Sequence, residues 1–313
     1  MKRPLFLIAS MGAVLLSPSS TSAAQCSAVV GDLAFGPVDT LSTTGSSAST
    51  SLTINCDQIS ESAGIVTVCG SLGAGTGGAS NGVRLLLQGG DALQFGLYAD
   101  APHSLPWGHY SEALSGAPLR LELAVTDGQA SAVLSVFGEV FGSQSTVPPG
   151  LYGTSLSGNA AIFHYDEGDA LDCSSPSGLS TNADFSVAAE VLPNCFIVAG
   201  DLDFGNSGLI DHSIDAAADI IVTCTPGTSY EISLDGGSSG VPSARIMQSG
   251  SNALSYGLYM NAARTQPWGE GAAVKSGEGE GQSETHTVYG RVAPQMAPPG
   301  TYSDTVVVTV LYE

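Results

Sequence analysis

The stretch ADFSVAAEVLPNC, residues 183–195, lies in the middle of the chain and decides how its two halves are divided. Its residues alternate in polarity, as they do along a β-strand with one buried face. The predicted buried face carries Phe185, Val187, Ala189 and Val191. A Ser/Gly/Pro-rich segment, SSPSGLSTN, precedes the stretch, and Cys195 ends it. The strand could therefore belong to either half, and the rest of the sequence must decide which.

The chain contains two copies of one sequence pattern. Three pairs of matching blocks keep the same order in both copies: CSAVVGDLAFG (26–36) and CFIVAGDLDFG (195–205), LQFGLYAD (93–100) and LSYGLYMN (254–261), VPPGLYGTSL (147–156) and APPGTYSDTV (297–306). Two copies of this length indicate tandem domains and not a solenoid. Short runs rich in Val, Thr, Leu and Tyr, separated by Gly, Pro, Asn and Ser, predict an all-β sandwich for each copy.

The first residues have the pattern of a secretory signal peptide. The chain begins MKRPLFLIASMGAVLLSPSSTSAAQC, with basic Lys2 and Arg3, an apolar core and small residues before Gln25. This pattern predicts a signal peptide over residues 1–24, too short and wrongly flanked for a membrane-spanning helix. We therefore expect a mature chain that starts at or near Gln25, directly before Cys26.

All six cysteines follow the predicted signal peptide. An even number of cysteines in a secreted chain predicts disulfides, and no pair has the C-x-x-C spacing of a zinc or thioredoxin site. Equivalent positions in the two copies pair Cys26 with Cys56 and Cys195 with Cys224. Cys69 and Cys173 have no counterparts in the second copy and are expected to pair with each other.

The composition is strongly acidic, with a formal net charge of −21. Such a surface repels phosphate backbones, so we expect no nucleic-acid partner. Anionic membranes are disfavoured for the same reason. The acidity is typical of a soluble extracellular protein.

No catalytic pattern in the sequence is convincing. Ser80 fits G-x-S-x-G formally but lies in a Gly/Ser-rich stretch and not at a strand-to-helix turn. His103 and His109 flank Trp107 without an evident third metal ligand, so we expect exposed loop histidines. We therefore expect neither an enzyme nor a bound metal or cofactor.

Three segments carry a resemblance to a known family. GDLDFG after a cysteine, YGLYMNAARTQPWG, and the C-terminal GTYSDTVVVTVLYE resemble the spore coat protein U domain family, over about residues 26–165 and 183–313. The family includes subunits of archaic (Csu-type) chaperone–usher pili. The resemblance implies immunoglobulin-like, pilin-type sandwiches that lack their last strand. A periplasmic chaperone, and later the N-terminal extension of the next subunit, fills the resulting groove.

Applied to this chain, the resemblance implies four regions. These are a signal peptide (1–24), an N-terminal domain (25–173), a linker with a donor strand (174–194), and a C-terminal pilin domain lacking its last strand (195–313). The donor strand is expected to fill the groove of the N-terminal domain in cis, against Leu156, Ala160 and Ile162. The open groove of the C-terminal domain is expected along Val306, Val308, Val310 and Tyr312.

With only Gln25 before Cys26, the mature chain would have no donor strand of its own, which implies the tip of a fibre. The resemblance then implies an adhesin that reaches the cell surface through the periplasm and mediates surface attachment and biofilm formation. The implied partners are a periplasmic chaperone, an outer-membrane usher, an adjacent pilin subunit, and a host or abiotic surface. Two alternatives stay open: a secreted coat or matrix protein, and a free lectin-like module.

Adhesion is expected in loops at the pole of the N-terminal domain that points away from the fibre. Three loops are candidates, residues 70–82, 101–110 and 141–148. The apolar and aromatic side chains they offer are Leu72, Leu105, Trp107 and Tyr110. Trp107 is repeated as Trp268 in the second copy, which favours a structural role for it.

Overall fold

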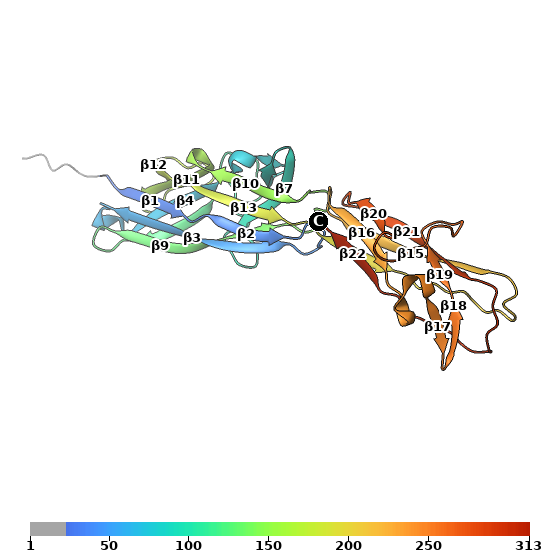
Figure 1. Cartoon of the computed structure of the whole chain (residues 1–313). Helices are drawn as coiled ribbons and strands as arrows, with labels where there is room; N and C mark the ends of the chain where they lie inside the picture. Colours follow the sequence, from blue (N-terminus) through green and yellow to red (C-terminus); the bar gives the residue numbers. More distant parts are fainter. Residues whose placement is uncertain (1–22) are drawn as a thin grey trace, which may run out of the picture.

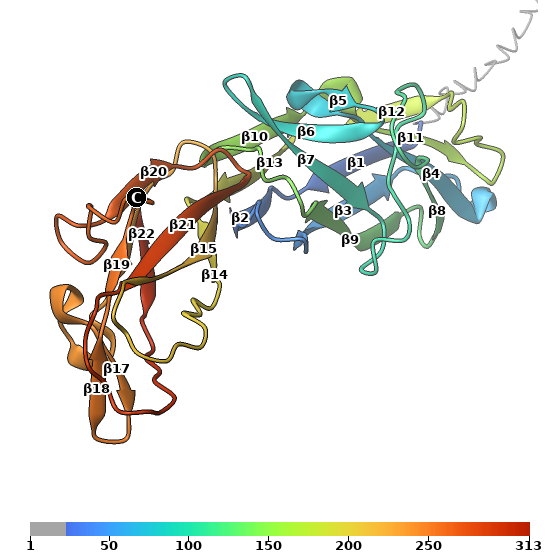
Figure 2. The same cartoon turned by 90° about the vertical axis from the view of Figure 1, so that its right-hand side faces the viewer.

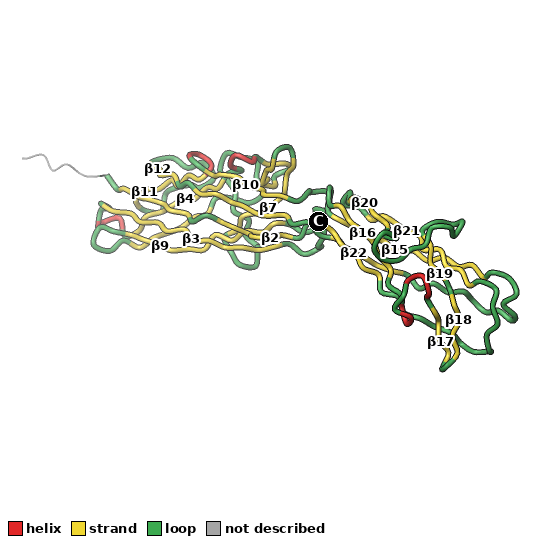
Figure 3. The backbone as a smooth tube through the Cα atoms, viewed as in Figure 1, coloured by secondary structure: helices red, strands yellow, loops and turns green. Residues whose placement is uncertain are grey.

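Alternation of apolar and polar residues produces strands along most of the chain. A computed structural model describes residues 23–313, whose regular elements are 22 strands and five short 3-10 turns (Figure 3). The all-β class expected from the sequence is confirmed. The predicted signal peptide lies outside the described residues except for its last two. Within the described range, no helical segment has the length and apolar character needed to cross a membrane.

The first thirteen strands form one lobe, here called the N-terminal lobe (Figure 1). Its larger sheet has the order β1-β3-β9-β7-β6-β10-β13-β2, with β5 beside β6, and its smaller sheet the order β12-β11-β4-β8. Both sheets contribute to one apolar core. The strands are β1 (Gln25–Val30), β2 (Leu33–Val38), β3 (Ser46–Asp57), β4 (Ile65–Leu72), β5 (Ala79–Ser80), β6 (Val83–Gln88), β7 (Asp91–Tyr98), β8 (Leu119–Ala124), β9 (Ala130–Val140), β10 (Gly150–Leu156), β11 (Ala161–Glu167), β12 (Leu179–Asn182) and β13 (Phe185–Val191).

The other nine strands form the C-terminal lobe. Its sheets have the orders β14-β15-β21-β19 and β20-β16-β22, and β17 and β18 form a separate hairpin. The two sheets share a core of their own. The strands are β14 (Cys195–Ala199), β15 (Ile214–Cys224), β16 (Ser229–Leu234), β17 (Ile246–Ser249), β18 (Asn252–Ser255), β19 (Gly257–Tyr259), β20 (Lys275–Glu278), β21 (Ser283–Val292) and β22 (Val308–Tyr312). Figures 1 and 2 show the two lobes lying end to end.

Three disulfides fasten the strands. Cys26–Cys56 joins β1 to β3, and Cys195–Cys224 joins β14 to β15 at the equivalent place. Cys69–Cys173 ties β4 to the segment that follows β11. These are the pairs expected from the sequence. Because they use all six cysteines, no disulfide crosses between the lobes.

β13 packs in the N-terminal lobe, although it lies just before Cys195. It runs antiparallel to β10, with Phe185 opposite Leu156 and Val191 opposite Gly150, and parallel to β2. Its four alternate apolar side chains are each no more than 5% exposed. The strand therefore connects β10 to β2 and completes the larger sheet.

The sequence analysis expected Leu156, Ala160 and Ile162 to lie on one strand beside β13, but the structure ends that strand at Leu156. After Leu156 the chain turns at Gly158–Ala160 and enters β11 in the smaller sheet, where Ile162 pairs with Ser71. The turn shifts the alternation by one residue, so Phe163 and not Ile162 belongs to the core. The expectation that Ala160 and Ile162 line the groove is therefore wrong.

Candidate functional site

The two segments that hold β13 have counterparts in the C-terminal lobe. By the internal repeat, residues 202–207 correspond to β2 and residues 300–306 to β10. Neither segment forms a strand, and only an isolated bridge between Ser303 and Gln248 pairs the second one. In the described part of this lobe, no strand takes the place that β13 has in the N-terminal lobe.

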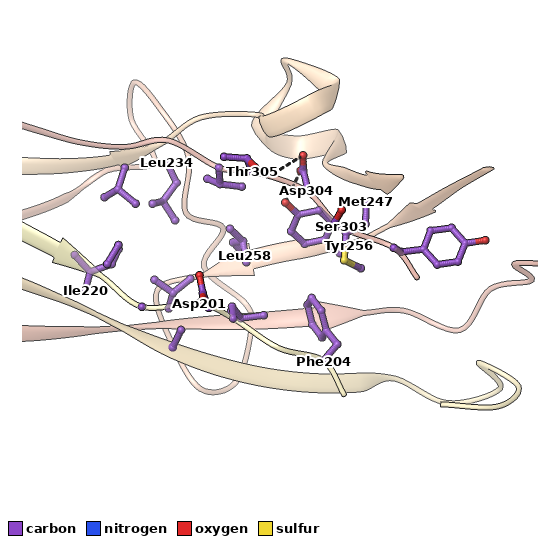
Figure 4. Close-up of a pocket in the computed structure, with 18 residues that line it drawn as sticks. Asp201, Phe204, Ile220, Leu234, Met247, Tyr256, Leu258, Ser303, Asp304 and Thr305 are labelled. Atoms are coloured by element: carbon purple, nitrogen blue, oxygen red, sulfur yellow. Dashed lines mark hydrogen bonds between the residues drawn. The ribbon is translucent and has the colours of Figure 1, made fainter. Parts of the chain in front are cut away.

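An open groove lies between these two segments (Figure 4), with a volume of ≈ 540 Å³. One edge carries Asp201, Leu202 and Phe204, and the other carries Tyr302, Asp304 and Val306. The apolar side chains that line it farther inside are Ile220, Leu234, Met247, Leu258 and Val288. We call this the acceptor groove.

The edges of the acceptor groove repeat the residues that enclose β13. Leu33, Tyr152 and Leu156 are almost fully buried beneath β13 in the N-terminal lobe. Their counterparts Leu202, Tyr302 and Val306 are only half-buried. The C-terminal lobe thus leaves accessible an apolar surface that the N-terminal lobe covers with one strand.

Two of the four residues expected to line the groove do so. Val306 and Val308 lie on its edge. Val310 and Tyr312 lie farther along β22, which pairs with β16, and are not part of the lining. The sequence analysis missed the opposite edge, Asp201 to Phe204, although this edge belongs to the repeated GDLxFG block and is equivalent to β2.

An aspartate at the start of each GDL block marks the strand position. Asp32 Oδ1 accepts a 2.7 Å hydrogen bond from the backbone N–H of Ser186 in β13, and this bond holds the pKa of the Asp32 carboxyl below its usual value. Asp201 is its counterpart on the edge of the acceptor groove. Within residues 23–313, no hydrogen-bond donor contacts the Asp201 side chain.

The acceptor groove also has a polar pair that the N-terminal lobe lacks. Asp304 Oδ2 accepts a 2.6 Å hydrogen bond from the Tyr256 hydroxyl, and Oδ1 accepts bonds from the N–H and O–H groups of Ser238. Burial favours the neutral form of Asp304, but the bonds from Ser238 and Tyr256 outweigh it and lower its pKa. The counterparts of Asp304 and Tyr256 are Thr154 and Phe95.

Both lobes share a buried arginine that the sequence analysis did not identify. Arg84 donates hydrogen bonds to the backbone carbonyls of Leu72, Gly73 and Trp107. Arg245 does the same to those of Leu234, Asp235 and Trp268. Burial lowers the pKa of Arg84 to about 10. The two arginines are 161 residues apart, which is also the offset between the blocks LQFGLYAD and LSYGLYMN. The internal repeat could therefore have identified them as equivalent residues.

Two of the four candidate adhesive side chains are buried. Leu72 is 0% exposed within β4, and Trp107 is 1% exposed with its indole N–H bonded to the Gly70 carbonyl. Tyr110 is half-buried and stacks on His109. Leu105 alone of the four is largely exposed, at 59%. The expectation that Leu72 offers a binding surface is wrong, and Trp107 is a core residue, in agreement with its repetition as Trp268.

The glycine-rich loop, residues 70–82, packs against its own lobe. The backbone N–H of Gly77 donates to the Thr154 hydroxyl in β10. A Cβ at Gly77 would overlap the Leu85 carbonyl, so the close approach requires glycine. Small residues in this loop therefore serve packing.

The third candidate loop, residues 141–148, faces the C-terminal lobe. A Cβ at Gly281 would overlap the carbonyl oxygen of Ser145. The register of β3 with β9, of β4 with β8 and of β4 with β11 places the turns that follow β3, β8 and β11 at the opposite pole of the N-terminal lobe. The loop at residues 141–148 is thus not at the pole where adhesion was expected.

The two histidines considered for metal binding are placed otherwise than expected. His109 is buried and bonds the Asn159 carbonyl through Nε2, and His103 Nδ1 lies 3.6 Å from Glu139. They are therefore not exposed loop histidines. Ser80 lies in the β5–β6 hairpin and not at a strand-to-helix turn. Among residues 23–313, no group of three or more His, Cys, Asp or Glu side chains is arranged to hold a metal ion.

Comparison with known proteins gives one family and several structures. The family model described as Spore Coat Protein U domain matches residues 12–157 and 181–309. A chain of the crystal structure of the CsuC–CsuE chaperone–tip adhesion subunit pre-assembly complex, from archaic chaperone–usher Csu pili of Acinetobacter baumannii, aligns with a TM-score of 0.53 at 16% identity. That alignment covers 91% of this chain and 99% of the other. The CupB6 tip adhesin from Pseudomonas aeruginosa aligns with a TM-score of 0.39 at 14% identity, over 92% and 94% of the chains. No curated protein matches.

Proposed function

The chain belongs to the spore coat protein U domain family, and we propose that it is the tip subunit, the adhesin, of an archaic chaperone–usher pilus. The shared fold with a chain of the chaperone–tip adhesion subunit complex supports this proposal. Because that structure is a pre-assembly complex of a chaperone with a tip adhesion subunit, the first partner we propose for this chain is a periplasmic chaperone.

One observation carries the proposal: the acceptor groove lies where the N-terminal lobe holds β13. In the N-terminal lobe a strand from the same chain completes the sheet. The C-terminal lobe has the two flanking segments and an apolar lining but no such strand. A strand from another polypeptide would complete it by β-augmentation. The proposed donors are the chaperone in the periplasm and the adjacent pilin subunit in the fibre, after handover at the outer-membrane usher.

The filled lobe predicts the geometry of the donor. A donor strand would run antiparallel to residues 300–306 and parallel to residues 202–207, as β13 does beside β10 and β2. Its alternate side chains would point toward Ile220, Leu258 and Val288, and Asp201 would accept one of its backbone N–H groups.

Attachment through the C-terminal lobe would leave the N-terminal lobe at the outer end of the fibre, because the lobes lie end to end (Figure 2). We therefore assign surface attachment, to a host or abiotic surface and in biofilm formation, to the N-terminal lobe. The proposed route is secretion through the periplasm to the pilus tip.

Hydrogen–deuterium exchange on the mature chain tests the open groove. Amides of residues 202–207 and 301–307 should exchange quickly, apart from those of Ser303 and Val307, which donate to Gln248 and Asp235, whereas the amides of β2 and β10 should exchange slowly. A synthetic peptide of residues 183–194, at millimolar concentration, should slow exchange in the first two segments, and a scrambled peptide should not. If residues 301–307 are as protected as β10 in the free chain, the groove is closed and the proposal fails.

A further inference from the structure

We infer that Asp304 selects the strand that enters the acceptor groove: it requires a hydrogen-bond-donating side chain opposite itself and discriminates against a copy of this chain's own β13. The inference rests on the proposed function, because it concerns the donor for the same groove. It names the chemistry of the partner, an extended strand from another subunit with one donor side chain among apolar ones.

The register in the N-terminal lobe identifies the residue that would face Asp304. Val187 of β13 lies directly opposite Thr154 of β10, and both side chains are buried in the core. Thr154 corresponds to Asp304. Directly opposed residues on one face of two strands have Cβ atoms about 5 Å apart. A strand bound as β13 is would therefore place its Val187 equivalent against the carboxylate.

Val187 suits Thr154 because the threonine hydroxyl already has partners. Thr154 Oγ1 accepts the Gly77 N–H at 2.8 Å and lies 3.4 Å from the hydroxyl of Thr76. Nothing polar is left for β13 to satisfy at this position. Asp304 presents a carboxylate at the same place.

The Asp304 carboxylate has one acceptor position to spare. Oδ1 accepts three donors, from Ser238 N–H, Ser238 O–H and Thr305 N–H. Among the described residues Oδ2 accepts only the Tyr256 hydroxyl, which leaves one of the two lone pairs of this oxygen without a protein donor. Although burial opposes it, the hydrogen bonds from Ser238 and Tyr256 favour the ionised form of Asp304 and lower its pKa. In the open groove, water can bind the second position of Oδ2.

A strand that covers the groove displaces this water. With valine opposite, the carboxylate is buried and one acceptor site is left unpaired, which is unfavourable. Threonine has the same shape as valine, and its hydroxyl can donate to Oδ2. The expected preference for threonine is about tenfold or more in Kd, the usual worth of a hydrogen bond to a charged group.

The discrimination has a consequence for assembly. A groove that accepted β13 equally well could take this strand from a second copy, and such head-to-tail contacts produce open filaments of one chain. A carboxylate in the groove disfavours that contact. The favoured donor has a large apolar residue opposite Val306, a donor side chain opposite Asp304, and a small residue opposite Tyr302, where β13 has Ala189 opposite Tyr152.

The experiment compares two fluorescent peptides on the full mature chain by anisotropy. One is ADFSVAAEVLPN, and the other is the same peptide with Val187→Thr. The unaltered chain should bind the threonine peptide about tenfold more tightly. In the Asp304→Thr chain the ratio should fall toward one, mainly because the valine peptide binds better. Asp203→Thr removes an exposed carboxylate two positions from Asp201 and should keep the ratio of the unaltered chain.

The ratio of the two peptides' Kd values on the unaltered chain can be measured without any variant of the protein. The inference therefore stays testable if Asp304→Thr is unstable. Asp304→Asn, which keeps the shape and removes the charge, is the second variant and should also narrow the ratio. Equal binding of the two peptides to the unaltered chain would overturn the selection by Asp304 and leave the proposed function standing. Absence of binding by either peptide at millimolar concentration would overturn both.

Discussion

The N-terminal lobe and the C-terminal lobe are two copies of one pattern that differ in the presence of a single strand. Both have the same disulfide between their first two cysteines and the same buried arginine. In one lobe β13 lies between β2 and β10, and in the other the matching segments enclose a groove. The difference teaches that the two lobes share the rest of their frame, and that under the proposed function the place of β13 is a binding site in the C-terminal lobe.

The groove is also not simply a core with one strand removed. Tyr256 and Asp304 replace a buried phenylalanine and a buried threonine with groups that keep hydrogen-bonding capacity in an open surface. A surface that must meet water before assembly gains from such groups, because exposed apolar patches promote aggregation. The filled lobe has no such requirement.

The largest expected effect is on the filled groove. Phe185→Asp would remove a buried ring and place a charge against the core, which should destabilise the N-terminal lobe by about 5 kcal/mol or more. Hydrogen exchange resolved by lobe should show the N-terminal lobe unprotected and the C-terminal lobe unchanged. Ala188→Asp, on the exposed face of the same strand, is the control and should leave both lobes protected. Retained protection in the Phe185→Asp chain would mean that β13 does not complete the lobe.

The buried arginines give the next largest effect and test whether the open lobe is fully packed. Replacing Arg84 or Arg245 with methionine leaves three backbone carbonyls without their donor, at a cost of about 3 kcal/mol. Each change should lower the free energy of unfolding of its own lobe, measured by hydrogen exchange at rising denaturant concentration. If Arg84→Met lowers stability and Arg245→Met does not, the C-terminal lobe is loosely packed in the absence of a donor strand. The two lobes would then not be equivalent in their packing.

Substitution of the equivalent aspartates Asp32 and Asp201 should have different effects in the two lobes. Asp32→Asn weakens acceptance of the Ser186 N–H, so that amide should exchange faster in the free chain. Asp201→Asn has no bound strand to lose and should leave the free chain unchanged, but it should weaken binding of the donor peptide. Loss of stability from Asp201→Asn in the free chain would show that Asp201 already serves the lobe itself.

The sequence predicted the all-β class, the disulfide pairs and the placement of residues 185–191 because each rests on alternation or on the repeat. It did not predict the turn at Gly158–Ala160, because apolar and polar residues alternate in the same way before and after it. The three residues of the turn shift this alternation by one position, so the side chains expected on the buried face of the strand lie on the other face. It assigned Leu72 to a loop surface because Gly/Ser-rich sequence is typical of loops, whereas tertiary contacts bury this side chain. The Asp304–Tyr256 pair joins residues 48 positions apart, which no local pattern reveals.

The smallest effect concerns acid, and it again compares the lobes. His164 in the N-terminal lobe has a lowered pKa because it is buried and lies near His109, and its Nδ1 has no hydrogen-bond partner within the described residues. Burial also lowers the pKa of His286 in the C-terminal lobe, but there the Glu284 carboxylate opposes the shift. A histidine with a lowered folded-state pKa contributes stability that is complete above its unfolded value, about 6.5, and is lost as the pH falls below it.

The N-terminal lobe should therefore lose more stability than the C-terminal lobe through its histidine between pH 7 and pH 5. The melting temperature of each lobe should depend less on pH over this range after His164→Gln, and the change should be smaller after His286→Gln. Equal changes after His164→Gln and His286→Gln would show that Glu284 does not protect its neighbour from acid, and that in this respect the two lobes are alike.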